Sequence, residues 1–173
     1  MDGTNHATYA RARNDPEQFR DLTQRAGLSS VIVVALDLDD FTLINDTHGH
    51  DVGDELLRHI AQNLRSAIRL PDTLARLGGD EFIIIATDLP SDQPADLIAR
   101  TSATRISHAL RKAVNINGNA LNVTGSIGVA VYPDDTTDEV LLRRLADQRM
   151  YAFKTKPISR APSSYHDIQA TAI

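Results

Sequence analysis

The chain has no cysteine, and this absence excludes several kinds of chemistry. Without thiols there is no disulfide framework, no thiolate metal site and no cysteine nucleophile. Long apolar runs are also missing, because the longest covers only residues 31–36, whereas a membrane-spanning helix needs roughly 20 residues. The first residues lack the basic and apolar regions of a secretory signal. We therefore expect a cytoplasmic domain with no membrane segment, either free or as the cytoplasmic part of a larger, membrane-anchored protein.

Positive charge is scarce as well, since 18 Lys and Arg residues face 23 Asp and Glu residues, for a net charge of −5. A domain that binds nucleic acid by neutralising phosphates normally has a basic face, so we expect no nucleic-acid partner. The acidic residues are unevenly distributed, with six Asp and no Lys or Arg between Asp37 and Asp54. Such a concentration of charge requires cations, protonation or full hydration.

The length of 173 residues suits a single domain. Two apolar runs flank Gly78 and Gly79, which predicts a hairpin because glycine supplies the positive φ of tight turns. The order of elements predicts an α/β (α+β) sandwich, with one mostly antiparallel sheet of about five strands surrounded by helices. The expected elements are a strand at 31–36, helices within 43–68, hairpin strands at 73–77 and 82–86, a helix at 95–114, a strand at 121–132 and a helix at 138–153.

Three acidic residues stand at the ends of predicted strands. Asp37 directly follows the first strand, and Asp80 and Glu81 lie at the tip of the hairpin. If these strands are neighbours, the three carboxylates meet at one end of the sheet. Converging carboxylates bind hard divalent cations or act as an acid and base pair, although an isolated acid is more often a solvated turn or cap. Mg²⁺ combines one or two carboxylates with substrate phosphates, so a nucleoside triphosphate would complete the first arrangement.

Four ordered motifs resemble the GGDEF domain family of diguanylate cyclases. They are the acidic stretch at 37–54, Ala-Arg-Leu-Gly-Gly-Asp-Glu-Phe at 75–82, Ser-Ile-Gly-Val-Ala at 126–130, and the stretch at 146–154 that ends in Tyr-Ala-Phe-Lys. The resemblance implies a fold like that of nucleotide cyclases and polymerase palms. The implied division of the chain is a lead-in helix at 1–30, a GGDEF catalytic domain at 31–156 and a tail at 157–173.

The resemblance implies a metal-assisted reaction of GTP at the carboxylate cluster. Asp37 and Asp80 correspond to metal-binding carboxylates, and the backbone carbonyl of Leu38 corresponds to a further oxygen ligand. Glu81 corresponds either to another metal ligand or to the group that helps to deprotonate the attacking 3′-hydroxyl. Asp37, Asp80 and Glu81 are thus the expected catalytic residues, and the implied cofactors are Mg²⁺ or Mn²⁺, two per active site.

Further residues match positions that contact the substrate in the family. Asn45 and Asp54 correspond to guanine readers, and a carboxylate can accept the N1 and N2 hydrogens that adenine does not offer, which favours GTP over ATP. Lys154 corresponds to a lysine that contacts the triphosphate as a point charge. His50 matches a substrate-binding position, although an imidazole in a helix-entry loop commonly bonds backbone, and zinc is not expected. The other implied substrate contacts are Phe41, Thr42, Gly78 and Gly79.

The implied product, cyclic di-GMP, has two-fold symmetry. We therefore expect a homodimer in which each copy holds one GTP and presents its 3′-hydroxyl to the other. Arg69 and Asp72 match the Arg-x-x-Asp site through which the product inhibits such enzymes, and Arg105 is the expected secondary partner. Considered without the resemblance, Arg69 and Asp72 would be a helix-terminal arginine and a turn residue.

Three departures from the family pattern bear on activity. Thr42 stands where lysine is usual, Ile158 stands where a phosphate-binding arginine is expected, and the usual N-terminal Asp-x-Leu-Thr-Gly-Leu-x-Asn-Arg signature is missing. Each lost contact to a charged group would weaken GTP binding by roughly 1.5–3 kcal/mol. The alternative is a weak or inactive module that senses cyclic di-GMP or GTP. A Ca²⁺-binding protein is disfavoured, because residues 37–54 lack EF-hand spacing.

Overall fold

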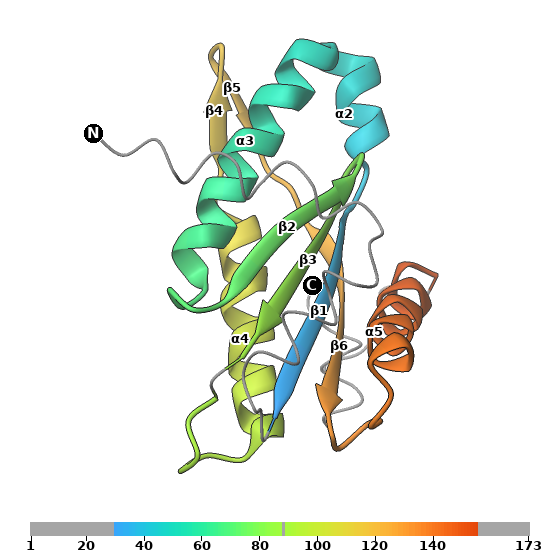
Figure 1. The fold of residues 1–173 in the computed structure, drawn as a ribbon. Coiled ribbons are helices and arrows are strands. Elements are labelled where there is room, and N and C mark those ends of the chain that lie inside the picture. The colour runs from blue at the N-terminus through green and yellow to red at the C-terminus, as the bar shows by residue number, and fades with distance from the viewer. Residues whose placement is uncertain (1–29, 88, 156–173) are drawn as a thin grey trace, which may run out of the picture.

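A four-stranded antiparallel sheet forms the centre of the domain in this computed structural model, which describes residues 30–87 and 89–155 (Figure 1). The predicted tail lies outside the described residues, as does the predicted lead-in helix except for residue 30. The predicted α/β sandwich with an antiparallel sheet is confirmed, although the central sheet has four strands in the described residues where about five were expected. The strands occur in the order β2-β3-β1-β6 and are β1 (Val31–Leu38), β2 (Thr73–Gly78), β3 (Glu81–Ala86) and β6 (Gly125–Tyr132).

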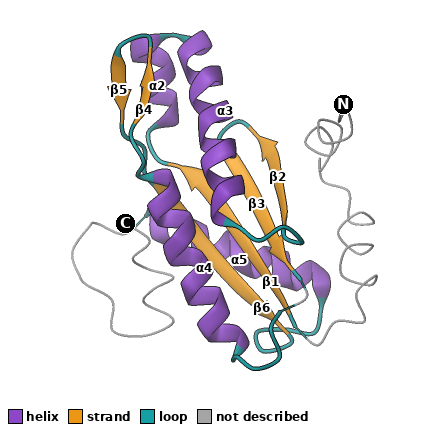
Figure 2. Ribbon diagram, turned by 90° about the vertical axis from the view of Figure 1, so that its left-hand side faces the viewer, coloured by secondary structure: helices purple, strands orange, loops and turns teal. Residues whose placement is uncertain are grey.

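Helices cover both faces of the sheet, so the central strand β1 is buried along its whole length. Alternate residues of β1 belong to two cores, as a period of two requires: Val34 packs in the larger core with α3 and α4, and Val33 packs in the smaller core with α5. Figure 2 shows α3 and α4 on one face and α5 behind the sheet. The helices are α2 (Phe41–His48), α3 (His50–Ala67), α4 (Ala95–Leu110) and α5 (Glu139–Lys154).

No helix in the described ranges combines the length and the apolar character that a membrane span requires.

Helix α5 lies against the sheet in backbone-to-backbone contact. A Cβ atom built on Gly128 of β6 would lie 2.0 Å from the Ala146 carbonyl oxygen and 2.3 Å from the Met150 nitrogen, so only glycine fits there. A fork of hydrogen bonds from Arg149 adds to this contact, because its Nη1 and Nη2 atoms each donate to the Asp135 carboxylate over 2.7 Å. The helix and its C-terminal residues are therefore held at a fixed place on the sheet.

The predicted single strand at 121–132 is interrupted. Its first part belongs to a separate hairpin, and the chain continues into the central sheet at Gly125. Asn117 and Gly118 both have positive φ (53° and 83°), as a two-residue hairpin turn requires, and the Asn-Gly pair is the sequence signal that the prediction overlooked. The predicted helix at 95–114 ends earlier, at Leu110. The hairpin strands are β4 (Val114–Ile116) and β5 (Asn119–Leu121).

Candidate functional site

The structure brings the three predicted catalytic acids together at one end of the sheet. Asp37 near the end of β1 is paired in register with Glu81 at the start of β3. The N–H of Leu38 donates to the backbone carbonyl of Asp80 over 3.3 Å, which ties the end of β1 to the hairpin tip. This proximity follows from the antiparallel pairing of β1 and β3, because the end of one strand then meets the beginning of the other.

The hairpin tip is tight and open to one side. Gly79 has φ of +53°, and the register between β2 and β3 shifts between Arg76 and Gly78. The Arg76 side chain closes the turn, because its Nε donates to the Gly79 carbonyl over 2.8 Å. A Cβ atom built on either Gly78 or Gly79 would meet no atom within 4 Å. The turn conformation therefore favours glycine at position 79, and the space outside both glycines is free for a ligand.

Burial and like charges make the carboxylate of Asp37 unfavourable. Its side chain is 10% exposed, and burial is the main cause that raises its pKa. The charges of Asp80 and Asp39 raise this pKa further, whereas a hydrogen bond from Lys154 Nζ to Asp37 Oδ1, 2.5 Å long, lowers it in part. The net direction is upward, so the charged form of the Asp37 carboxylate remains disfavoured even with Lys154 beside it.

Lys154 reaches this cluster from the C-terminal end of α5, 117 residues away in sequence. Its hydrogen bond to Asp37 is the main cause that raises the lysine pKa. The side chain is still 44% exposed, so the ammonium group lies between the carboxylate and solvent. An anionic ligand that approaches from solvent would therefore meet the lysine first.

Asp39 has a different role from Asp37, although the two lie in one acidic stretch. Its carboxylate accepts hydrogen bonds from Thr124 Oγ1 (2.7 Å) and Ser126 Oγ (2.9 Å), and its N–H donates to the Thr124 carbonyl (2.9 Å). These bonds fasten the end of β1 to the start of β6. Sequence reasoning assigned no role to Asp39 or Thr124 and treated Ser126 only as part of a packed strand.

The cluster fits a cation that arrives together with an anionic substrate. Among the described residues, no group of three or more His, Asp or Glu side chains is arranged to hold a metal ion without other ligands. Asp37 already has a cationic group at one carboxylate oxygen, and Asp80 is near enough to raise its pKa. One or two carboxylates completed by phosphate oxygens and water are what Mg²⁺ prefers, so these residues suit Mg²⁺ or Mn²⁺ with a nucleotide.

The two predicted guanine readers lie on consecutive helices, α2 and α3. The Oδ1 atom of Asn45 is buried and has no hydrogen-bond partner in the described part of the chain. A Cβ atom built on Gly53 would lie 1.8 Å from this oxygen and 3.3 Å from Phe41 Cζ, so a small residue at 53 leaves room for the amide. Asp54 follows Gly53 and is exposed. Gly53 is a site residue that sequence reasoning missed.

The other predicted substrate residues of this region differ in exposure. Thr42 and His50 are exposed at the starts of α2 and α3. Phe41 is 8% exposed and belongs to the larger hydrophobic core. A Cβ atom built on Gly53 would lie 3.3 Å from its Cζ atom, so Phe41 lies beside Gly53 and supports the site from inside the domain.

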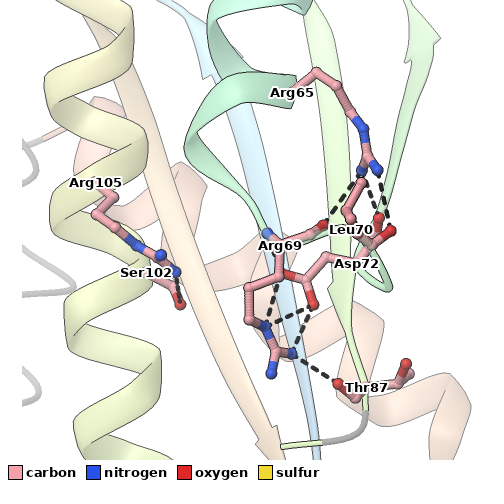
Figure 3. Close-up of polar contacts among 7 residues, drawn as sticks. All are labelled: Arg65, Arg69, Leu70, Asp72, Thr87, Ser102 and Arg105. Carbon is pink, nitrogen blue, oxygen red and sulfur yellow. Dashed lines mark hydrogen bonds and ion pairs between the residues drawn. The ribbon is translucent and has the colours of Figure 1, made fainter.

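A second cluster lies in the turn after α3, where Arg69 and Asp72 bind each other (Figure 3). Arg69 Nη2 donates to Asp72 Oδ1 over 2.6 Å, and the Arg69 N–H donates to Asp72 Oδ2 over 2.9 Å. The same Nη2 atom also donates to the Thr87 carbonyl over 2.7 Å. Arg105 lies on α4, where its Nη2 donates to Ser102 Oγ over 3.4 Å. Asp72 is 5% exposed, and its charge is balanced within the turn by the Arg69 guanidinium.

Comparisons with known proteins agree on one family. The family model described as "Diguanylate cyclase, GGDEF domain" matches residues 12–160. The signaling protein YkoW of Bacillus subtilis is 42% identical over 132 residues, which are 76% of this chain and 16% of YkoW. The first curated relatives are much longer proteins, because this chain spans a third or less of each.

Solved structures agree with the family model. The GGDEF domain of PA1120 (YfiN or TpbB) from Pseudomonas aeruginosa is 32% identical with a TM-score of 0.68, over 80% of this chain and 83% of that one. The GGDEF domain of DgcB from Caulobacter crescentus, solved in complex with c-di-GMP, is 26% identical with a TM-score of 0.67, over 86% of this chain and 90% of that one.

Proposed function

The chain belongs to the diguanylate cyclase GGDEF domain family, and from this membership we propose that it condenses two GTP molecules into cyclic di-GMP with release of two pyrophosphates. The single observation that carries the proposal is the meeting of Asp37 with Asp80 and Glu81 at the end of the sheet. The proposal concerns this domain, and the activity of any longer protein that contains it is a separate question.

Asp37, Asp80, Glu81 and the Leu38 carbonyl would hold the two divalent cations. When bound, these ions neutralise the phosphates and stabilise the attacking and leaving oxygens of the phosphoryl transfer. The carboxylates would hold the two cations next to the triphosphate. Glu81 is exposed and is the acid that would accept the proton of the 3′-hydroxyl. Lys154 would exchange its hydrogen bond to Asp37 for one to a phosphate oxygen of GTP.

Asn45 and Asp54 would recognise the guanine of each GTP. The buried Asn45 Oδ1 lacks a partner, which suits an atom that receives a hydrogen bond from a bound base. Asp54 would accept the N1 and N2 hydrogens of guanine, a donor pair that adenine lacks. Gly78 and Gly79 leave open space for the phosphates. His50 and Thr42, which are exposed at the starts of α3 and α2, would be further substrate contacts.

Two copies of the domain would act together, because each GTP must present its 3′-hydroxyl to the α-phosphate of the other. A homodimer with two-fold symmetry matches the symmetry of the product. Product inhibition would act through Arg69 and Asp72, with Arg105 as a secondary contact. The GGDEF domain of DgcB, which has a similar fold, was solved in complex with c-di-GMP, and this supports the proposal.

The decisive test is incubation of the protein with GTP and Mg²⁺, in parallel with the Asp80→Ala variant and with Asp92→Ala. Asp92 is exposed in the loop before α4 and serves as the matched control. We expect cyclic di-GMP from the parent and from Asp92→Ala, and a rate at least about a hundredfold lower from Asp80→Ala.

A second candidate function is a sensor of cyclic di-GMP or GTP, which Thr42 favours because it removes a positive charge expected near the phosphates. Tight nucleotide binding with no turnover by the parent would support the sensor and contradict the cyclase. Equal turnover by the parent and by Asp80→Ala would contradict the assigned chemistry.

A further inference from the structure

The turn after α3 has little local structure of its own to hold it. Helix α3 ends at Ala67, and Ile68 is extended (φ −105°, ψ 163°), so the helix lacks the left-handed residue that commonly satisfies its last carbonyls. Leu70 at the apex is 90% exposed. One backbone hydrogen bond closes the turn, from the Asp72 N–H to the Arg69 carbonyl over 3.2 Å. The turn needs further donors for its carbonyl groups.

Arg65, in the last turn of α3, supplies these donors from a single side chain (Figure 3). Its Nη1 donates to the Asp72 carbonyl over 2.8 Å and is 3.5 Å from the Arg69 carbonyl. Its Nη2 donates to the Leu70 carbonyl over 3.0 Å. Three carbonyls of a four-residue segment therefore point at one guanidinium, whose planar fork offers several donors in a rigid arrangement.

We infer that Arg65 is a positioning residue for the product-binding site, which it serves by fixing the backbone from which Arg69 and Asp72 project. This inference rests on the proposed function, because that function makes Arg69 and Asp72 the groups that recognise cyclic di-GMP. Arg65 itself touches only backbone atoms of the turn among the contacts described above, so it acts through the two recognition residues.

The inference gains weight from the way in which Arg69 and Asp72 are paired. A ligand that takes the Asp72 carboxylate must open a 2.6 Å ion pair in which that carboxylate is almost fully buried. The bonds of Arg65 go to carbonyl oxygens and do not involve those side chains. They can therefore remain in place while the pair opens, and the turn stays ordered when its own internal ion pair is lost.

The test compares Arg65→Met, Arg65→Lys and Arg58→Met, each combined with Asp80→Ala so that no product is formed during the measurement. Arg58 is an exposed arginine on the same helix and serves as the matched control. Calorimetric titration with cyclic di-GMP gives the product affinity. The GTP affinity is measured on the same Arg65 and Arg58 variants with Asp80 intact, using Mg²⁺ and a GTP analogue that cannot be cyclised, because Asp80 is itself a proposed metal ligand. Hydrogen exchange at the amides of Arg69, Leu70 and Asp72 reports on the turn without any ligand.

We expect Arg65→Met to weaken cyclic di-GMP binding at least about tenfold, equivalent to 1.4 kcal/mol, and to change GTP binding less than about twofold. The Asp72 amide should exchange faster in the same variant. Arg65→Lys should recover part of both effects, since it keeps the charge and one donor direction. Arg58→Met should behave like its parent. If Arg65→Met does not fold, Arg65→Lys carries the test, with a smaller expected loss.

The results separate this inference from the proposed function. If the parent with Arg65 intact binds no cyclic di-GMP, the product site itself is wrong and the inference is overturned with it. If the parent binds and Arg65→Met binds equally well, with unchanged amide exchange, only the role of Arg65 is wrong. Equal weakening of GTP and cyclic di-GMP binding would show a general structural role and would also overturn the inference.

Discussion

Two buried carboxylates, Asp37 at the end of the sheet and Asp72 in the turn after α3, are neutralised in different ways. Burial raises the pKa of Asp37, and the charge of Asp80 raises it further, although Lys154 lies beside the carboxylate and lowers it in part. Asp72 accepts hydrogen bonds from the guanidinium and from the backbone N–H of Arg69. The first site therefore lacks positive charge, whereas the second is neutral without any ligand.

This difference predicts different responses to ligands. A site that lacks positive charge gains stability when cations and a nucleotide bind, because binding relieves repulsion and desolvation. A site that is already paired must break its own bonds before it can bind, so its affinity is reduced by the free energy of that opening.

Arg69→Met should cause the largest loss of stability, about 2–4 kcal/mol, because it leaves the Asp72 carboxylate buried with only a backbone donor. Urea unfolding in EDTA measures this loss. The double variant with Asp72→Asn should recover much of it, since the uncompensated charge is then gone. A loss no larger than that of Lys154→Met would contradict the contrast between the two sites.

Gly53→Ala should destabilise the domain by about 1–3 kcal/mol, because the added methyl group would overlap Asn45 Oδ1. In an unobstructed helix the same change would stabilise the protein by roughly 0.5–1 kcal/mol. A decrease in the free energy of unfolding would therefore indicate the clash. Adding Asn45→Ala should restore the favourable sign. GTP affinity should fall in both variants, as measured by titration, and an unchanged affinity would argue against guanine recognition by Asn45.

Lys154→Met should cost at most about 1 kcal/mol in EDTA, because its ion pair with Asp37 is partly exposed. Thermal unfolding with and without Mg²⁺ and GTP is the measurement. We expect the ligands to stabilise the parent more than the variant, since the lysine would contact the triphosphate. Lys112→Met, at an exposed lysine just after α4, is the control and should respond like the parent.

Asp37→Asn should give the smallest change, a gain of about 2 °C in Tm at pH 7 in EDTA. The raised pKa means that the folded protein binds this proton more tightly than the unfolded chain does, so folding is favoured at low pH and this advantage is lost as pH rises through the raised pKa. The gain should vanish below about pH 4. Asp147→Asn should give a gain of the same sign but smaller, because partial burial raises the pKa of Asp147 while its side chain is 41% exposed.

Much of the fold and the position of the carboxylate cluster could be predicted from local patterns. The apolar run at 31–36 and the glycine pair at 78–79 indicate a strand and a hairpin, and antiparallel pairing then brings Asp37 next to Asp80. The hairpin of β4 and β5 was also within reach of local rules, since Asn117 and Gly118 carry its turn signal.

What the sequence does not show are contacts whose partners are distant along the chain. Lys154 meets Asp37 only because α5 packs across β6 and β1, and the bonds between Asp39 and Thr124 depend on the pairing of β1 with β6. The clash that requires Gly53 depends on the angle between α2 and α3. Such contacts depend on tertiary packing, which periodicity and residue preferences do not encode.

The close approach at Gly128 has a consequence for evolution and for protein engineering. Even one methyl group there would push α5 outward from the sheet, since the obstructing atoms are backbone atoms that cannot rotate away. Lys154 lies four residues beyond Met150, about 6 Å along the helix axis, so its ammonium group would move with the helix. A residue with no side chain in the middle of a strand thereby limits how far Lys154 can move. If Lys154 binds the triphosphate as proposed, substitutions at position 128 should weaken nucleotide binding from a distance.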